Sequence, residues 1–534
     1  MTQQRVWCIG GLDTSGGAGI TRDLITLADL GVHGCAISTQ VAAQTSSALL
    51  CTQPTSASNL NEQWQALASE DMPGAIKIGA IANDEQALVL CARLQTLPKP
   101  KPFVVWDPVL TTSSGGTLSV LSSNSIRALL AHVDLITPNT DELGVLTGLT
   151  VDSEEVFSLA LEALLSLGAK AIFAKGGHAK WQHEATDTYI SADTRITFSQ
   201  PRDLAGALRG TGCMLASALC AFWVKDYAIA DALTLANAYL KQVRAAAFAT
   251  ALAASNKKQH SAQSRHCGSR KIAMAPAVGF PSVPSDFPSV CFGENDPVSL
   301  RKAVSPCDVL PRCDVLSRCA PAPFPALYAP GHPRSDLGIY PVVEDAAWLT
   351  KLLPTGVNII QLRVKTGTKE AISAQIQKAV ALTKHSDCKL FINDHWQLAI
   401  EHGAYGVHLG QEDLATANLT AIRKAGLRLG VSTHGYAEIQ RIKRLRPSYI
   451  ALGHIFPTTT KTMPSKPQGV ERLGEYVALC EGIPTVAIGG INLSNVKAVA
   501  QTGVSSIAVV TAITQAANPF SAYYDLAKEA GFAN

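Results

Sequence analysis

Eight short apolar runs, separated by helix-like stretches, repeat through residues 337–534 of this 534-residue chain. They read IYPVV, NIIQL, KLFIN, GVHL, RLGVS, YIALG, TVAIG and SIAVV. Strand-like runs that alternate with amphipathic stretches are typical of parallel sheets covered by helices, and eight such units close into a (β/α)8 barrel. The functional groups of these barrels lie where the strands end. We therefore predict a TIM-type (β/α)8 barrel over residues 337–534, with its site in the loops that follow the strands.

Polar and small residues follow these runs where the functional loops are expected. Two carboxylates near Arg and Lys suit a Mg²⁺-bound diphosphate, because this hard cation takes oxygen ligands. The loops after the seventh and eighth strands commonly bind phosphate through backbone N–H groups. Any single residue here could be an ordinary surface polar group, and only the whole set indicates a site. In chain order the set is Gln361, Arg363, Lys365, Asn393, Asp394, Asp413, Ser432, Thr458, Thr460, Lys461, Gly490, Val510 and Thr511.

The motifs QLRVK, INDHWQLA, GVHLGQED, GVSTH, YIALGHIFPTTTK, AIGGI and IAVVTAI resemble thiamine-phosphate synthase over residues 337–532. The resemblance implies that hydroxymethylpyrimidine diphosphate is joined to thiazole phosphate and that diphosphate leaves. Arg363 and Lys461 would neutralise the leaving group, so they are the catalytic candidates of this half. His395 stands where Arg is expected at least as often. By the resemblance, Gln361, Arg363, Lys365, Asn393, Ser432 and Lys461 hold the pyrimidine diphosphate, Asp394 and Asp413 hold Mg²⁺, and Thr458, Thr460, Gly490, Val510 and Thr511 hold the thiazole phosphate.

Residues 1–254 show a second alternation of strands and helices, which predicts a three-layer α/β/α domain. The expected strands are Val6–Ile9, Ile37–Val41, Ile76–Ile78, Phe103–Trp106, Leu135–Thr137 and Ala171–Ala174. A glycine-rich turn, GGLDTSGGAG, follows the first of them and lets the backbone approach a ligand closely. It is neither a Walker loop nor a GxGxxG fingerprint, so a turn without a ligand remains an alternative.

A second motif, Arg209-Gly210-Thr211-Gly212-Cys213, opens an apolar helical run. Backbone N–H groups at a helix start form an anion hole, and the helix dipole favours the charge of a transferring phosphoryl group. We expect this position to lower the pKa of Cys213, so that the cysteine accepts the proton of a substrate hydroxyl. Gly210 and Gly212 would border the hole. The alternative is a small buried cysteine without a catalytic role.

Asn139, Glu142 and Lys175 also follow predicted strands. Asn139 and Glu142 can order Mg²⁺ through water, and Lys175 can neutralise ATP phosphates. The N-x-x-E spacing also has the form of a capping box, which is the competing interpretation.

Residues 5–254 resemble the hydroxymethylpyrimidine kinase branch of the ribokinase-like family. The resemblance rests on GLDTSGGAGI, Gln44, KIG, DPV, TPNxxE, KGGH and GTGC. The resemblance implies transfer of a phosphoryl group from ATP to hydroxymethylpyrimidine and then to its monophosphate. It makes Cys213 the base. Two departures are Leu12, where Ser is usual, and Arg209, where His is usual. The resemblance also places Gly11, Asp23 and Gln44 near the pyrimidine, and Asn139, Glu142 and Lys175 on the ATP and Mg²⁺ side.

Residues 255–336 lose the alternation and are rich in Pro, Ser, Arg and Cys, so we interpret them as a linker. Cys307, Cys313 and Cys319 are evenly spaced there and leave a metal clip as a weak alternative, because CxxC pairs are missing. The division into two enzymes is chemically consistent, since the diphosphate made by the first half is the substrate of the second. The alternatives for the first half are a kinase for a pyridoxal- or thiazole-type alcohol and a non-catalytic ligand sensor.

The composition agrees with an enzyme that acts on small molecules. The net charge is +3, and basic stripes with interleaved aromatic residues are missing, so we expect no nucleic-acid partner. The start of the sequence resembles neither a signal peptide nor a membrane span, and we expect a cytoplasmic protein that does not bind membranes. By analogy with ribokinase-like domains, the kinase half could form a homodimer.

Overall fold

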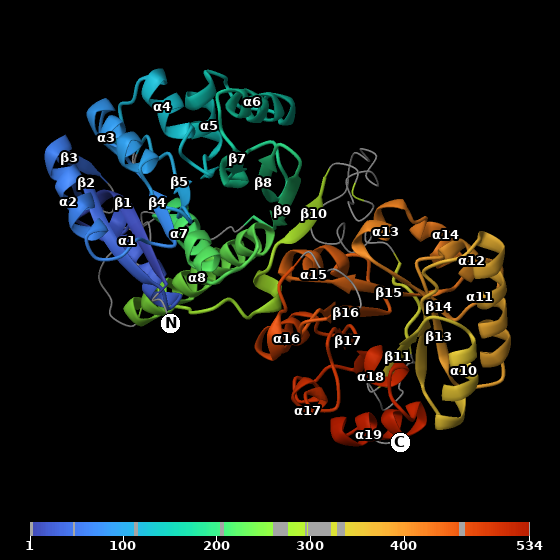
Figure 1. The fold of residues 1–534 in the computed structure, drawn as a ribbon. Helices are drawn as coiled ribbons and strands as arrows, with labels where there is room; N and C mark the ends of the chain where they lie inside the picture. Colours follow the sequence, from blue (N-terminus) through green and yellow to red (C-terminus); the bar gives the residue numbers. More distant parts are fainter. Residues whose placement is uncertain are drawn as a thin grey trace. The chain divides into compact units, whose positions relative to one another are not determined.

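The computed structural model describes residues 4–45, 48–111, 116–202, 208–259, 276–293, 296, 322–327, 337–458 and 465–532. The chain divides into two compact units, Met1–Glu294 and Asn295–Asn534 (Figure 1).

The first unit is built on one sheet with the strand order β10-β9-β8-β7-β6-β5-β4-β1-β2-β3. Its centre is parallel, and the carboxyl ends of these central strands therefore lie at one edge. The parallel strands are β1 (Arg5–Asp13), β2 (His33–Gln44), β4 (Ala75–Ile78), β5 (Phe103–Trp106), β6 (Leu135–Ile136) and β7 (Ala171–Ala174). Antiparallel strands extend both sides: β3 (Leu49–Pro54), β8 (Ala185–Ser191), β9 (Arg195–Gln200) and β10 (Ser289–Phe292).

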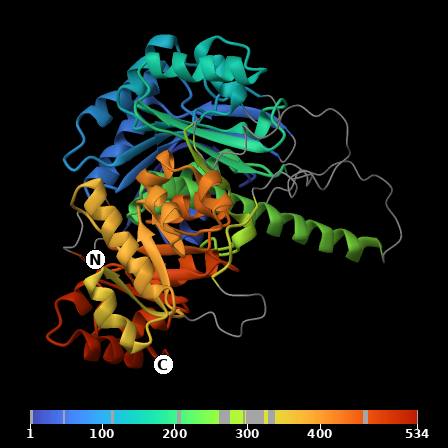
Figure 2. The ribbon, with the colours of Figure 1, turned by 90° about the vertical axis from the view of Figure 1, so that its right-hand side faces the viewer.

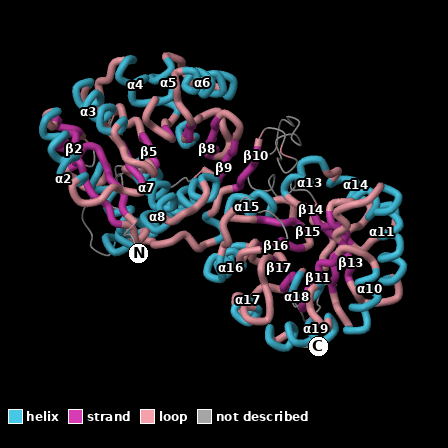
Figure 3. Tube along the Cα trace, viewed as in Figure 1, coloured by secondary structure: helices cyan, strands magenta, loops and turns pink. Residues whose placement is uncertain are grey.

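Helices cover both faces of this sheet, which confirms the predicted three-layer α/β/α arrangement (Figures 1 and 3). The helix α7 is buried along most of its length, because it packs between the sheet and α8. One face carries α1 (Gly19–Asp29), α7 (Thr211–Val224) and α8 (Ile229–Gln259), and α8 continues past the sheet (Figure 2). The other face carries α2 (Ala57–Ala68), α3 (Asp84–Gln95), α4 (Ser123–Leu130), α5 (Thr140–Thr147) and α6 (Glu154–Ser166). The unit also contains two short turns of 3-10 helix, η1 (Gly176–His178) and η2 (Pro284–Asp286).

The range expected to be a linker contains ordered parts of both units. The helix α8 runs to Gln259, and β10 pairs with β9 in the first unit. In the second unit Phe324 N–H donates to Arg446 O at 3.0 Å, and Leu327 is buried in the barrel core. The structure thus places the division of the chain at residues 294 and 295, where the sequence had suggested a tether over 255–336. The metal clip that remained an alternative for Cys307, Cys313 and Cys319 lies outside the described residues.

The second unit is a closed barrel of eight parallel strands, which confirms the TIM-type prediction. Its strands are β11 (Gly338–Val343), β12 (Ile359–Leu362), β13 (Lys389–Asn393), β14 (Gly406–Leu409), β15 (Arg428–Thr433), β16 (Tyr449–Gly453), β17 (Thr485–Ile488) and β18 (Ser506–Val509). Helices follow the strands around the barrel (Figure 3). They are α10 (Ala347–Leu352), η4 (Leu353–Thr355), α11 (Lys369–Thr383), α12 (Trp396–Glu401), α13 (Gln411–Thr416), α14 (Leu419–Lys424), α15 (Tyr436–Lys443), α16 (Gly469–Leu479), α17 (Val496–Ala500), α18 (Thr511–Thr514) and α19 (Pro519–Ala530).

Among the described residues, we find no helix with both the length and the apolar character that crossing a membrane demands.

Candidate active sites

A buried ion pair lies between α1 and β4 in the first unit. Lys77 Nζ is 2.9 Å from Asp23 Oδ2, and the two side chains are 1% and 0% exposed. Ser217 Oγ, from α7, donates to Asp23 Oδ1 at 2.8 Å. Burial raises the pKa of Asp23, although Lys77 and Ser217 oppose this effect. Asp23, expected near the pyrimidine, is thus held by side chains from two other elements, β4 and α7, and its partner Lys77 was not in the predicted site.

A second charged cluster joins the ends of β5 and β7 to the start of α5. Lys175 Nζ lies 2.8 Å from Asp107 Oδ1 and 3.7 Å from Glu142 Oε2. A Cβ on Gly212 would lie 3.2 Å from Lys175 Nζ and 3.5 Å from Asp107 Oδ2, so the GTGC segment borders this cluster. Asp107 Oδ2 is buried and has no hydrogen-bond partner among the described residues. An oxygen left in this state suits a cation or a donor from a ligand.

The pKa values of this cluster are shifted by burial and by mutual charge. Burial raises the pKa of Glu142 to about 7, while Lys175 lowers it and Asp107 raises it. Burial opposes ionisation of Asp107, but Lys175 and Lys77 outweigh it and hold the pKa of Asp107 below its usual range. Asn139 and Glu142 also form the capping box of α5, with the Asn139 N–H donating to Glu142 Oε2 at 2.8 Å. The capping interpretation is therefore confirmed, and it coexists with the contact to Lys175.

Cys213 lies in the first turn of α7 and is 7% exposed. The charges of Lys77, Asp23 and Asp107 act on its thiol, Lys77 lowering its pKa and the two carboxylates raising it. Burial raises the pKa of Cys213 to about 11, so the expectation of a lowered pKa is wrong for this structure. The helix start favours a thiolate, but removing the thiol from water disfavours the charged form more strongly.

Gly210 brings the GTGC segment against the glycine-rich turn. Its φ is +71°, and a Cβ there would lie 2.3 Å from Gly17 O. Gly19 has φ +62°, and a Cβ there would lie 2.1 Å from Gly11 O. Both positions therefore require glycine, because a side chain would collide with backbone. The two glycine motifs, which are far apart in sequence, form one lining.

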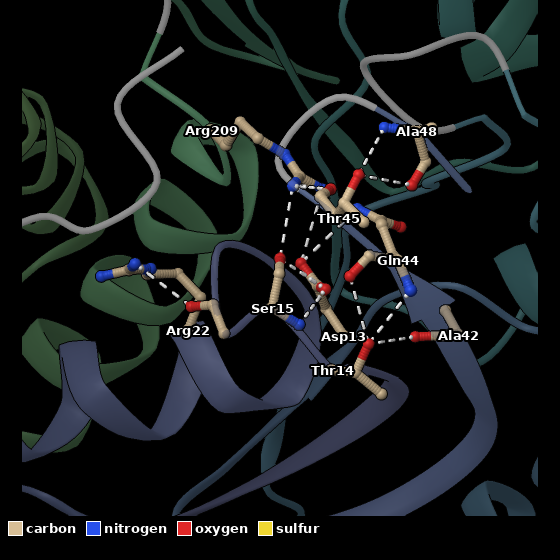
Figure 4. A network of polar contacts seen from close by, with 10 residues as sticks. Asp13, Thr14, Ser15, Arg22, Ala42, Gln44, Thr45, Ala48 and Arg209 are labelled. Carbon is tan, nitrogen blue, oxygen red and sulfur yellow. Dashed lines mark hydrogen bonds and ion pairs between the residues drawn. The ribbon is translucent and has the colours of Figure 1, made fainter. Parts of the chain in front are cut away.

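Arg209 does not point at the charged cluster around Lys175 but closes a separate network over the glycine-rich turn (Figure 4). Its Nη2 lies 3.4 Å from Asp13 Oδ2, and its Nη1 donates to Thr45 O at 2.6 Å and to Ser15 Oγ at 3.3 Å. Gln44 Nε2 donates to the same Asp13 Oδ2 at 3.5 Å. Gln44, expected beside the pyrimidine, thus shares a carboxylate with the residue that departs from the family pattern.

In the barrel, two carboxylates face each other at the ends of β13 and β14. Burial, followed by the charge of Asp413 and a hydrogen bond to it, raises the pKa of Asp394 to about 6, while Arg363 and His395 lower it. Asn393 Nδ2 donates to Asp394 Oδ2, and Asp394 N–H donates to His408 O at 2.9 Å. Asp394 has φ +62°. Crowded carboxylates beside the half-buried Arg363 are a donor set that fits a hard divalent cation.

A cavity of about 430 Å³ lies over the ends of β11 and β12. Arg363 and Lys365, both expected to hold the diphosphate, line it, and so does Val510 from the end of β18. Glu344 and Asp345 also line it, and neither was predicted. The cavity thus places two predicted cations beside two carboxylates that the motif pattern had not indicated.

A column of polar side chains runs through the barrel interior, and sequence reasoning missed most of it. Gln361 Nε2 donates to Tyr340 Oη at 3.4 Å, and Tyr340 Oη lies 3.0 Å from Tyr449 Oη. Tyr449 Oη lies 2.7 Å from His408 Nδ1, and His408 Nε2 lies 2.8 Å from Ser432 Oγ. Burial, with the charge of Arg363, lowers the pKa of His408 to about 3, so the ring is neutral at pH 7. The column ties Gln361 to Ser432 through groups on facing strands.

The ends of β17 and β18 supply close backbone contacts. Gly490 has φ +66°, and a Cβ there would lie 2.4 Å from Pro457 O. Asn495 Nδ2 donates to Gly490 O at 3.1 Å. Val510 precedes the short helix α18, which begins at Thr511, and Thr458 follows β16. Thr460 and Lys461 lie outside the described residues.

Comparisons with known proteins divide the chain in the same way. A family model described as Thiamine monophosphate synthase matches residues 339–513, and one described as Phosphomethylpyrimidine kinase matches residues 13–259. The thiamine-phosphate synthase of Photorhabdus laumondii subsp. laumondii is 58% identical over 191 residues, which cover 36% of this chain and 88% of that protein. The thiamine-phosphate synthase of Serratia proteamaculans is 57% identical over 194 residues, covering 36% and 89%. A crystal structure of phosphomethylpyrimidine kinase from Clostridium difficile 630 shares 28% identity over 44% of this chain and 97% of that chain, with a TM-score of 0.38.

Proposed function

We propose a division of labour between two active sites, from the premise that this chain belongs to the thiamine-phosphate synthase family and carries a phosphomethylpyrimidine kinase domain before it. The chain is a bifunctional enzyme of thiamine biosynthesis. The match of residues 13–259 to phosphomethylpyrimidine kinase favours this function over a kinase for another vitamin alcohol or a ligand sensor.

In the kinase half, Cys213 accepts the proton of the substrate's hydroxymethyl group as the hydroxyl oxygen attacks the γ-phosphorus of ATP. The bond between that phosphorus and the bridging oxygen breaks, and ADP leaves. Gly11, Asp23 and Gln44 bind the pyrimidine. Lys175 neutralises charge on the phosphates, and the backbone N–H groups at Gly210 and Gly212 stabilise the phosphoryl group in transfer. Asn139 and Glu142 hold Mg²⁺ through water. The observation that carries this assignment is the position of Cys213 in the first turn of α7, with Lys77, Asp23 and Asp107 acting on its thiol.

In the synthase half, Asp394 and Asp413 hold Mg²⁺, which neutralises diphosphate when it is bound. Gln361, Arg363, Lys365, Asn393, Ser432 and Lys461 orient the pyrimidine diphosphate, and Thr458, Thr460, Gly490, Val510 and Thr511 bind the thiazole phosphate. The bond from the pyrimidine methylene carbon to the diphosphate oxygen breaks, and the thiazole nitrogen takes the carbon. Positive charge spreads into the pyrimidine ring, so positioning and electrostatics suffice without a protein nucleophile. The pair of Asp394 and Asp413 beside Arg363 carries this assignment.

The decisive experiment supplies the full chain with hydroxymethylpyrimidine, thiazole phosphate, ATP and Mg²⁺ and follows thiamine phosphate by chromatography. A parallel reaction receives preformed pyrimidine diphosphate and no ATP. Cys213→Ala should slow the route from the alcohol by about 10²- to 10⁴-fold, the usual loss of a general base, and should leave the second route unchanged. Cys220→Ala is the matched control, because Cys220 is buried in the same helix.

Asp394→Asn should have the opposite pattern and block both routes at the synthase step, with accumulation of pyrimidine diphosphate in the first. Asp387→Asn, which changes an exposed aspartate before β13, is its control. Product from preformed diphosphate alone would show that the N-terminal half does not phosphorylate the alcohol. A homodimer through the kinase half is a further proposal, which light scattering of the full chain tests.

A further inference from the structure

Asp296 lies between the two matched families, in the range that the sequence suggested to be a linker, yet its carboxylate is buried in the barrel unit. It follows β10 by four positions in the chain and precedes residue 339, where the synthase match begins. Its side chain is 0% exposed and forms a two-oxygen ion pair with Arg441 on α15, whose side chain is 8% exposed. Arg441 Nη2 donates to Asp296 Oδ1 at 2.9 Å, and Arg441 Nε donates to Oδ2 at 2.9 Å and to Oδ1 at 3.2 Å.

The remaining nitrogen of Arg441 extends this contact toward the synthase site. Arg441 Nη1 donates to Gln411 Oε1 at 2.6 Å, and Gln411 Nε2 donates to the backbone oxygen of Ser432 at 2.6 Å. Gln411 is the first residue of α13, the helix that carries Asp413. An unbroken series of hydrogen bonds therefore links Asp296 to the end of β15 and to the helix of a candidate metal ligand.

A carboxylate that binds a guanidinium through both oxygens fixes the plane of the guanidinium. The direction of Arg441 Nη1, and with it the amide of Gln411, is set by Asp296. If the carboxylate is removed, a buried cation must turn toward another oxygen or toward water. Gln411 Oε1 then loses the donor that holds its amide in place. The hydrogen bond from Gln411 Nε2 to the Ser432 backbone oxygen weakens as a result.

We infer that Asp296 is a positioning residue for the synthase site, acting through Arg441 and Gln411 on Ser432 and on the start of α13. The inference rests on the proposed function, because Ser432 and Asp413 receive their roles there. It gives the segment between the two enzymes a part in the second reaction.

The test uses the full chain with the variants Asp296→Asn and Arg441→Lys, and with preformed pyrimidine diphosphate as substrate. We expect the KM for the diphosphate to rise about tenfold, within the range seen when a partner behind a ligand is lost, while kcat changes less. Calorimetric titration with inorganic diphosphate and Mg²⁺ should show a matching loss of affinity. The kinase rate of the same preparation should stay unchanged. Glu529→Gln is the matched control, because it breaks an exposed ion pair of the same unit with Lys497.

The double variant Asp296→Asn/Arg441→Gln removes both charges and leaves no unpaired ion, so it serves if the single variants fail to fold. It should show the same rise in KM and the same loss of diphosphate affinity, well below its unfolding temperature. An unchanged KM and an unchanged Kd for diphosphate in folded variants would overturn the inference, and would reduce Asp296 to a structural role. Failure of the wild-type chain to make thiamine phosphate would instead refute the proposed function, and the titration would still decide the role of Asp296.

Discussion

The buried pair of Lys77 and Asp23 offers a sharp test of what stabilises the kinase unit. The two charges are 2.9 Å apart with side chains 1% and 0% exposed, so water screens them little. Lys77→Met removes the ammonium group at similar volume and leaves Asp23 with the hydroxyl of Ser217. Breaking a buried ion pair in this way costs about 3–5 kcal/mol, because one charge stays uncompensated.

This loss converts into a measurable shift of the melting temperature. Domains of this size lose about 2 °C per kcal/mol, at the low end of the usual range, so the transition of the kinase unit should fall by about 6–10 °C in scanning calorimetry. Lys77→Met/Asp23→Leu removes both charges and should regain most of the loss. Synthase activity from preformed diphosphate, measured below both transitions, reports that the barrel is intact.

The pH dependence of the variant has a definite sign. Burial raises the pKa of Asp23, and Lys77 is the largest influence that lowers it, so the variant should have a still higher pKa at Asp23. When the pKa of a carboxyl is higher in the folded than in the unfolded state, the group is protonated in both states at low pH and does not destabilise the fold. As the pH rises, ionisation favours the unfolded state and the free energy of unfolding falls. The loss of melting temperature caused by Lys77→Met should therefore be smaller at pH 5 than at pH 8. The loss caused by Lys77→Met/Asp23→Asn should not depend on pH in this way. A melting temperature within about 2 °C of wild type at pH 8 would refute the reasoning.

Three further predictions concern the two sites. Tyr449→Phe removes the hydroxyl that His408 Nδ1 contacts, and should cost about 1–3 kcal/mol in denaturant unfolding of the barrel. If the thiolate of Cys213 is the base, its pKa of about 11 makes the kinase rate rise nearly tenfold per pH unit from pH 7 to 9.5, and a flat profile would contradict that role. Gly490→Ala should raise the KM for thiazole phosphate, because its Cβ would meet Pro457 O at 2.4 Å, whereas Gly482→Ala, with φ +78° and open space, tests the backbone strain alone.

The alternation of apolar runs was enough to predict the parallel core of both units. All eight barrel strands and the six expected strands of the first unit are present, because an apolar strand bounded by helices has a local signature. The antiparallel strands were missed. Strand β10 has the sequence SVCF within a Pro- and Ser-rich stretch, and it forms because β9 offers an edge to pair with.

The residues of the candidate sites likewise fall into those that sequence motifs indicate and those that only the tertiary structure brings together. Motifs at strand ends made Arg363, Asp394 and Lys175 site candidates, because a barrel or a parallel sheet brings successive strand ends together whatever the details of packing. His408 and Tyr449 carried no such signal, since a hydrogen bond between residues on separate strands depends on side chains that only the closed barrel brings together.

By itself, then, the sequence determined the two folds, the two reactions that its motifs indicate and the strand ends that are proposed to carry them. The tertiary structure decided the rest, for one physical reason: burial and partners from distant segments set the state of a side chain. Cys213 lies at a helix start that favours a thiolate, but the packed core around it raises its pKa to about 11. Asp296 stands in a stretch that reads as a tether, but Arg441, far along the chain, makes it a buried part of the barrel.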